Sequence, residues 1–376
     1  MTFEQPKKTR PFPAFADVVI IFLALAYAMS IPLALKSGPL IDFPTYYFCS
    51  LAQEKGVDIY DQQAVARLAS STGYEGYIAN YGYPPTLLVL IHPLTSFDVT
   101  TAYKLWVLFN QIILLLTIAL YYLSSGKKGF IEFRPNLLIS SLFIIYLYVS
   151  SSSGQVVMLM LLLMTLTYFL MKQKRSALAG VSLGFSSMVK PLTLVFLPYL
   201  LFKGELRTLS TALATMAAIS ILLSVYAGWD VLSYPLNVAA KRFESTTSFE
   251  THLVKADPEL FGLYKAGVIL LFLAVLYLSC RGVSGRYQKA RFDMEYAFLL
   301  VSVLILTPEA AYYNYIYLLP VCWILYDRRA DLLSVPWTRY SMTLLFLLVL
   351  TPLVYVTILS TVALWLLLLY LMFKLR

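Results

Sequence analysis

Two charged residues stand where a membrane protein could use them for chemistry. Asp42 follows the first long hydrophobic segment and begins a polar, tyrosine-rich stretch, IDFPTYYFCSLAQEKGVDIYDQ. A carboxylate there can act as a base on a substrate that approaches from the membrane surface. Lys190 lies near the middle of an apolar segment, LAGVSLGFSSMVKPLTLVFLPYLL. A lysine at the centre of a membrane helix costs about 2.5 to 3.5 kcal/mol on insertion scales, so it usually faces a cavity, a carboxylate or an anion.

Each of the two residues also has a purely structural interpretation. Asp42 could cap the helix that enters the tyrosine-rich stretch. Lys190 could extend its ammonium to an interface at a helix break made by Pro191. The alternative for Lys190 is a phosphate ligand, because a lysine at a broken helix adds a point charge beside unsatisfied backbone groups.

The composition indicates a polytopic membrane protein. Of 376 residues, 60% are hydrophobic and 13% charged, and the mean hydropathy is +0.74. Soluble proteins carry about 25% charged residues, so this chain has more apolar surface than a soluble fold could bury. Cys49, Cys280 and Cys322 form no CxxC pair, which predicts neither a disulfide framework nor a zinc site. The net charge of +9 suits cytoplasmic loops and anionic lipid better than nucleic acid.

The apolar segments predict an all-α fold. Val18–Leu35 has no charge over 18 residues, close to the roughly 20 that cross a hydrocarbon core of about 30 Å. No small-residue cleavage site follows it, so we predict an uncleaved first helix with its N-terminus inside. Since the runs lack the alternation of barrel strands, we expect about 10 to 13 membrane helices in one transmembrane domain, residues 1–376. The further apolar runs lie at 84–97, 101–123, 136–149, 156–171, 176–202, 208–227, 263–280, 294–307, 310–326 and 340–373.

Two polar segments, 36–83 and 229–262, combine charges with aromatic residues, as interfacial helices do. If 84–97 and 176–202 each cross the membrane once, the predicted inside loops hold 14 basic residues and the outside loops 12. If 84–97 is a short re-entrant element and 176–202 folds back at Lys190, the counts become 20 and 6. The second topology fits the positive-inside rule better, and both place the two polar segments on the outer face.

Five segments occur in the order seen in glycosyltransferase family 87. They are Asp42 after the first span, NYGYPPTLLVLIHPL (80–94), Gly154-Gln155, AGVSLGFSSMVKP (179–191) and TPEAAYYNYIYLLP (307–320). Over roughly residues 17–326 the chain resembles the polyprenyl-phosphate-mannose-dependent mannosyltransferases of the C-type membrane glycosyltransferase fold. It departs from the family pattern near the last segment, where Tyr312 to Tyr315 replace the usual Trp and His.

The resemblance implies an enzyme of the plasma (inner) membrane with its active site on the outer face. The enzyme would move a hexose, with mannose expected first, or a pentose from a polyprenyl-phosphate donor to a lipid or glycan acceptor, with inversion. Asp42 would be the catalytic base, and Lys190 with Lys241 or Arg242 would hold the donor phosphate. The residues predicted to contact substrate are Tyr46, Tyr83, Gln155, His252, Glu309 and Tyr313.

Several other residues have structural interpretations, and two other functions compete with glycosyl transfer. Asp58 and Asp61 could join Asp42 around a divalent metal, but DxxD at the start of an amphipathic stretch is more often a helix cap, and we predict no cofactor. His92 is expected to be a buried hydrogen-bonding group. The competing functions are a secondary transporter, which an intramembrane lysine in a broken helix would also suit, and a lipid-carrier-dependent glycan ligase or polymerase.

Overall fold

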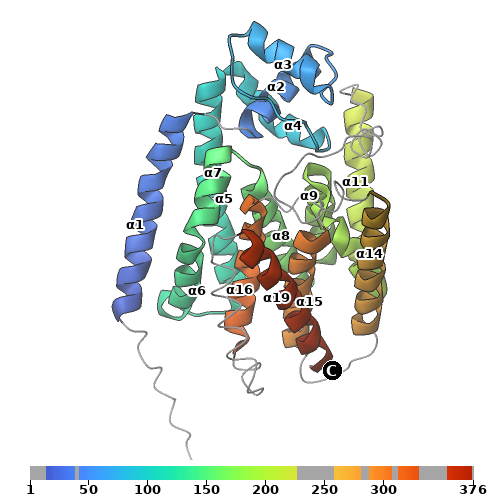
Figure 1. Cartoon of the computed structure of the whole chain (residues 1–376). Helices are drawn as coiled ribbons and strands as arrows, with labels where there is room; N and C mark the ends of the chain where they lie inside the picture. The colour runs from blue at the N-terminus through green and yellow to red at the C-terminus, as the bar shows by residue number, and fades with distance from the viewer. Residues whose placement is uncertain are drawn as a thin grey trace, which may run out of the picture.

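The computed structural model describes residues 14–38, 42–226, 258–280, 288–306, 312–329 and 354–374. All regular elements in these ranges are helices, which confirms the predicted all-α class. Most of them stand side by side as a bundle, and three short helices lie across one end of it (Figure 1).

Three helices in the described ranges are long and apolar enough to cross a membrane. They lie in α1 (Ala14–Ser37), α5 (Val99–Ser125) and α11 (Leu206–Tyr226). A bent pair, α6 (Phe130–Leu142) and α7 (Ile144–Ser153), which meet at 55°, makes a fourth candidate span. The predicted 10 to 13 crossings stay a prediction, because shorter apolar helices accompany these spans and part of the chain lies outside the described ranges.

The ends of α5 illustrate how local sequence sets helix bounds. The Asp98 carboxylate accepts hydrogen bonds of 3.0 Å from the backbone N–H groups of Thr100 and Thr101, which caps the first turn. Gly126 ends the helix with a φ of 72°, a left-handed conformation that glycine adopts without steric cost. Between these signals the outward-facing side chains are apolar, including Leu108, Ile112 and Leu115, as a lipid-facing surface requires.

Helix α9 (Ser176–Val189) packs very closely on α11, and its glycines are the reason. A Cβ on Gly180 would collide with the Thr211 side chain, and a Cβ on Gly184 would lie 2.5 Å from the Ala212 carbonyl oxygen. The spacing of these glycines is the GxxxG pattern that lets two membrane helices approach each other. On its other side α9 packs against α8 (Val157–Lys172).

The remaining bundle helices are α10 (Phe196–Lys203), α14 (Pro258–Cys280), α15 (Gln288–Leu306), α16 (Leu318–Asp327) and α19 (Val354–Lys374). Helix α15 is central and packs against α14, α16 and α19. A hydrogen bond of 2.8 Å from Trp365 Nε1 to Ser302 Oγ joins α19 to α15. In such apolar surroundings an interhelical hydrogen bond fixes the register of the pair.

The short helices α2 (Asp42–Glu54), α3 (Gln62–Ser71) and α4 (Thr86–Ile91), with the 3₁₀-helix η1 (His92–Ser96), form a cap over one end of the bundle (Figure 1). With six and five residues, α4 and η1 are too short to cross a bilayer core of about 30 Å. This agrees with the re-entrant interpretation of 84–97. The expectation that His92 is buried is wrong: its side chain is exposed at the start of η1.

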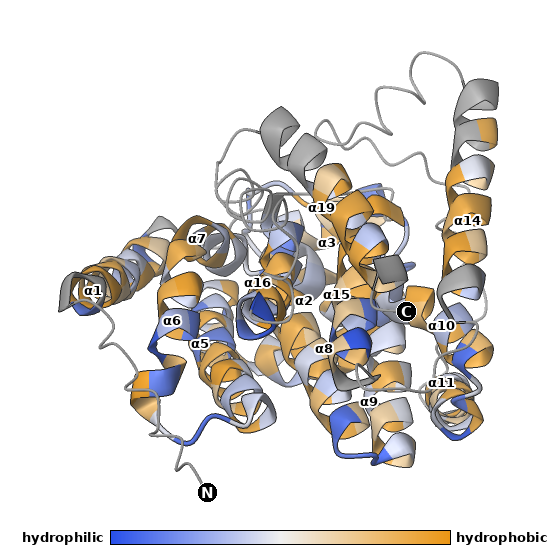
Figure 2. Cartoon of the chain, turned by 90° about the horizontal axis from the view of Figure 1, so that it is seen from below, coloured by the Kyte–Doolittle hydropathy of each residue, from blue (hydrophilic) through white to orange (hydrophobic). Residues whose placement is uncertain are grey.

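The opposite end of the bundle, which we call the basic end, carries Lys127, Lys172, Lys203 and Arg328 at or just beyond helix termini. Figure 2 views the molecule from there, with hydrophobic residues along the helices and hydrophilic residues at helix ends such as those of α8 and α9. Buried carboxylates take up part of this charge. Asp293 accepts hydrogen bonds from Arg328 Nε at 2.7 Å and from the Tyr168 hydroxyl at 2.7 Å.

Candidate functional site

Asp42 lies at the junction of the cap and the bundle, as the first residue of α2. Its side chain is half-buried. Burial raises the pKa of this carboxyl from 3.8 to about 6, although the neighbouring Gln155 amide and the Lys190 ammonium both lower it. Both neighbours come from breaks between other helices, so the environment of Asp42 is a tertiary site and extends beyond the first turn of α2. A carboxylate with a pKa near 6 is poised for proton transfer near neutral pH.

Gln155 reaches Asp42 because Gly154 allows a close approach. Gly154 ends α7 with a φ of 69°, and a Cβ there would lie 2.5 Å from the Cβ of Phe43 in α2. Any larger residue would push the α7–α8 turn away from the cap. The Trp106 indole N–H donates to the Gly154 carbonyl oxygen at 2.7 Å and holds the turn from the other side. The Gln155 side chain is fully buried as a result.

Lys190 stands at a break between helices. Helix α9 ends at Val189, Lys190 is extended with a φ of −148° and a ψ of 116°, and the 3₁₀-helix η2 (Pro191–Val195) follows. A residue before proline avoids the helical conformation, so Pro191 explains the break that the sequence predicts. The Lys190 side chain is 5% exposed. A lysine that extends to a membrane interface keeps its ammonium in water, whereas Lys190 is buried and has its partners inside the protein.

The Lys190 ammonium is surrounded by polar and aromatic groups of two other segments. It donates a hydrogen bond of 3.2 Å to Asn314 Oδ1, and it lies 5.1 Å from the Tyr83 ring centroid and 5.4 Å from that of Tyr313. Both ring distances are within the range of a cation–π interaction. The structure therefore brings the predicted residues Lys190, Tyr83 and Tyr313 into one cluster, close enough to Asp42 to influence its ionisation.

Tyrosines of the cap line the same site. Tyr46 lies one helical turn after Asp42, and its hydroxyl donates to Gln155 Oε1 at 2.9 Å. Its ring meets that of Tyr83 edge-on at 5.7 Å. Burial raises the pKa of the Tyr46 phenol well above its usual value, and Tyr83 and Asp42 raise it further, so this phenol stays protonated and donates its hydrogen bond. These tyrosines therefore line the site.

Two site residues were missed by the candidate list drawn from the sequence. Asn314 accepts the hydrogen bond of Lys190. The Tyr317 hydroxyl interacts electrostatically with Tyr83, is fully buried, and has no hydrogen-bond partner in the described part of the chain. The available signal was a polar amide and several phenols inside an otherwise apolar run, YYNYIYLLP.

The other predicted residues do not join this cluster. Lys241, Arg242, His252 and Glu309 lie outside the described residues. Asp61 caps α3, since its Oδ1 accepts from the N–H groups of Gln63 at 3.0 Å and Ala64 at 3.1 Å, which confirms the cap interpretation. Asp58 Oδ1 accepts from the Tyr60 N–H at 2.9 Å within the preceding turn. In the described ranges, no three His, Cys, Asp or Glu residues form a group that could hold a metal ion.

Comparison with known proteins gives one match. The model of glycosyltransferase family 87 matches residues 81–308. The match includes Tyr83, Gln155 and Lys190, whereas Asp42 and Tyr46 precede it. No curated protein and no solved structure matches the chain.

Proposed function

Because the chain belongs to glycosyltransferase family 87, and is therefore a multi-pass membrane glycosyltransferase, we propose that the Asp42–Lys190 cluster is its active site. We propose further that the enzyme takes its sugar from a polyprenyl-phosphate donor. The supporting observation is the pairing itself: a carboxylate with a pKa of about 6 lies within electrostatic reach of a buried ammonium. One group suits proton removal and the other suits a leaving phosphate.

The reaction needs only these two charges in defined places. The acceptor hydroxyl gives its proton to the Asp42 carboxylate while its oxygen bonds to the anomeric carbon of the donor sugar. The bond from that carbon to the phosphate oxygen breaks, and its electron pair leaves with the phosphate, which Lys190 stabilises. No protein nucleophile is required, so the transfer inverts the anomeric configuration. Lys241 and Arg242, from the second polar segment, are proposed as further phosphate ligands.

The buried donors and the rings give the sugar its proposed contacts. The hydroxyl of Tyr317 is buried without a hydrogen-bond partner among the described residues, and the Gln155 amide lies beside Asp42. A buried polar atom left unpaired costs about 1 to 3 kcal/mol, and oxygens of a bound substrate would remove that cost. Tyr46, Tyr83 and Tyr313 supply ring faces and edges for a sugar. His252 and Glu309 remain proposed substrate contacts.

The finer identity of the substrates follows the family resemblance. We propose a hexose, with mannose first, or a pentose as the transferred sugar, and a lipid or glycan on the outer face of the plasma membrane as the acceptor. Family membership favours an enzyme over the alternative of a secondary transporter. A glycan ligase or polymerase remains the alternative within the enzyme class. Such an enzyme would use a donor that carries a long glycan, whereas the proposed enzyme would use a donor that carries one sugar.

Asp42→Asn tests the assignment. The change keeps the shape of the side chain but removes the basic oxygen, so transfer from a polyprenyl-phosphate sugar should fall by about 10² to 10⁴-fold. Asp61→Asn is the matched control, because it makes the same change elsewhere in the cap. Asp61 is the N-cap residue of α3, a role that Asn fulfils equally well. Near wild-type turnover by Asp42→Asn would refute the catalytic role. If the unmodified protein uses none of a panel of polyprenyl-phosphate sugars, the donor class is wrong.

A further inference from the structure

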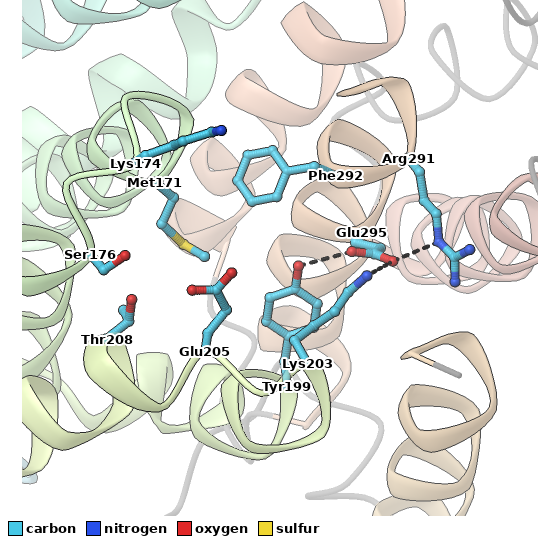
Figure 3. Close-up of a pocket in the computed structure, with 10 residues that line it drawn as sticks. All are labelled: Met171, Lys174, Ser176, Tyr199, Lys203, Glu205, Thr208, Arg291, Phe292 and Glu295. Carbon is cyan, nitrogen blue, oxygen red and sulfur yellow. Dashed lines mark hydrogen bonds and ion pairs between the residues drawn. The ribbon is translucent and has the colours of Figure 1, made fainter. Parts of the chain in front are cut away.

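A cavity lies at the basic end, away from Asp42. Its volume is about 510 Å³, and it is lined from the α8–α9 turn, from α10 and the start of α11, and from α15 (Figure 3). Helix α8 separates the two sites, because it starts beside Gln155 and ends at Lys172, 16 residues or about 24 Å later. The glycosyl-transfer site therefore does not account for this cavity.

One side of the cavity is an ion-paired cluster of Arg291, Glu295 and Lys203. The Glu295 carboxylate accepts a hydrogen bond of 2.9 Å from Arg291 Nε and pairs with Lys203 Nζ at 2.7 Å (Figure 3). Tyr199 also donates to Glu295, at 2.9 Å. The rim adds exposed Lys174 and Glu205, whose charges offset each other.

Two helices begin at this cavity, with their N-termini toward it. Ser176 is the first residue of α9, and Thr208 is the third residue of α11. No side chain caps the first turn of α9. The N–H groups of a first turn lack partners within their helix and carry the positive end of its dipole, so both helices favour an anion between them.

Thr208 supplies an independent sign of a missing ligand. Its side chain is 1% exposed and lines the cavity, yet its Oγ1 atom has no hydrogen-bond partner in the described ranges. A buried hydroxyl is rarely left unpaired in a folded protein. In Figure 3 the hydroxyls of Thr208 and Ser176 lie together on one wall of the cavity, opposite the cluster around Glu295.

The backbone at Lys174 is a third unusual feature. Lys174 has a φ of 56°, and among the described residues it is the one non-glycine residue with a positive φ. The α8–α9 turn would adopt this conformation more easily with glycine. A lysine kept at a strained position on the rim of a cavity is consistent with a binding role for its side chain.

We propose that this cavity binds the phosphate group of an anionic ligand, with Thr208, Lys203 and the first turns of α9 and α11 as its ligands and Lys174 at the rim. Its volume exceeds the needs of a bare phosphate, and Met171 and Phe292 add apolar wall, so the anionic headgroup of a membrane phospholipid fits better than free phosphate. The proposal does not depend on the glycosyltransferase mechanism.

The test is calorimetric titration of the full-length protein in neutral detergent at fixed ionic strength. The three probes are inorganic phosphate, short-chain phosphatidylglycerol and short-chain phosphatidylcholine. We expect phosphatidylglycerol to bind more tightly than phosphatidylcholine. Binding of inorganic phosphate as well would assign the recognition to the phosphate alone, and binding of phosphatidylglycerol without phosphate would assign it to the lipid headgroup.

The variants should change affinity for the anion in opposite directions. Thr208→Val and Lys203→Met should each weaken binding about tenfold, because each removes a direct ligand. Glu205→Gln should strengthen it by removing a negative charge from the rim. Arg207→Met, which removes an exposed positive charge from the same turn of α11 but outside the cavity lining, and Thr215→Val further along α11 are the matched controls.

Lys174→Gly separates binding from folding. Relief of the positive φ should raise the melting temperature, while loss of the ammonium should lower affinity for the anion. The proposal is refuted if the unmodified protein binds neither phosphate nor phosphatidylglycerol. It is equally refuted if phosphatidylcholine binds as tightly as phosphatidylglycerol, or if Thr208→Val and Lys203→Met bind like the controls.

Discussion

Tyr46 and Gln155 lie 109 positions apart in the chain and are joined by a hydrogen bond of 2.9 Å from the Tyr46 hydroxyl to Gln155 Oε1. Because Oε1 is the acceptor, the Nε2 atom is the end of the amide that can donate to Asp42. The amide is also close enough to Asp42 to lower its pKa. Tyr46 thus orients a buried donor beside the proposed catalytic carboxylate.

The pH dependence of transfer should report this arrangement. With Asp42 as the base, kcat/KM should rise as the pH increases through about 6, since the raised pKa leaves the carboxyl protonated and inactive at lower pH. Gln155→Glu should move this inflection to higher pH, because a second carboxylate beside Asp42 disfavours ionisation of the pair. A profile that is flat between pH 5 and pH 7, within about one unit of the expected inflection, would exclude Asp42 as the titrating base.

Lys190→Met should weaken binding of the donor. A hydrogen bond to a charged group contributes about 1.5 to 3 kcal/mol, which corresponds to a loss of affinity of roughly 10- to 150-fold. Lys104→Met, at an exposed lysine of α5, is the control for loss of one positive charge. Direct titration with a polyprenyl-phosphate sugar measures the affinity of each variant for the donor. Equal affinities in the two variants would indicate that Lys190 has only a structural role.

Asp293 is expected to contribute to stability at the basic end. Its side chain is 4% exposed and pairs with Arg328 Nη2 at 2.6 Å. Asp293→Ala leaves the buried Tyr168 hydroxyl and the half-buried Arg328 and Lys172 without this acceptor, and we expect a loss of about 1 to 3 kcal/mol of unfolding free energy. Asp17→Ala, which breaks the more exposed Asp17–Arg134 pair, should cost about 0 to 1 kcal/mol. Equilibrium unfolding in mixed micelles compares the two, and equal losses would contradict the buried-pair argument.

Cysteine labelling tests which end of the molecule faces outward. Gln173 lies at the basic end and Glu75 follows α3 in the cap, and both are exposed. The 20 to 6 charge distribution predicts that an impermeant thiol reagent labels Glu75→Cys in intact cells but leaves Gln173→Cys unlabelled until the cells are opened. Labelling of Gln173→Cys from outside would reverse the assignment of the two faces.

The membrane class, the all-α fold and the break at Lys190 follow from the amino-acid sequence alone. These depend on composition, on the length of apolar runs and on the conformational limits that Pro191 imposes on its neighbour, all of which are local. The sequence also marked Asp42 and Lys190 as candidates, because charged groups in or beside apolar runs are costly and so are rarely placed there without a role. Tyr46 and Gln155 became candidates through the family resemblance.

Which of these residues meet depends on the packing of the whole bundle. The Lys190–Asn314 hydrogen bond joins residues 124 positions apart, and no local pattern encodes such a contact. Close packing that depends on glycine, such as the approach of Gly154 to Phe43, brings the separate segments together. The same holds for the cavity at the basic end, where Thr208 and Lys203 look like ordinary helix-end residues in the sequence. Their proposed role in anion binding depends on burial, on the charges of neighbouring helices and on the convergence of two helix N-termini. These properties exist only after the bundle has packed.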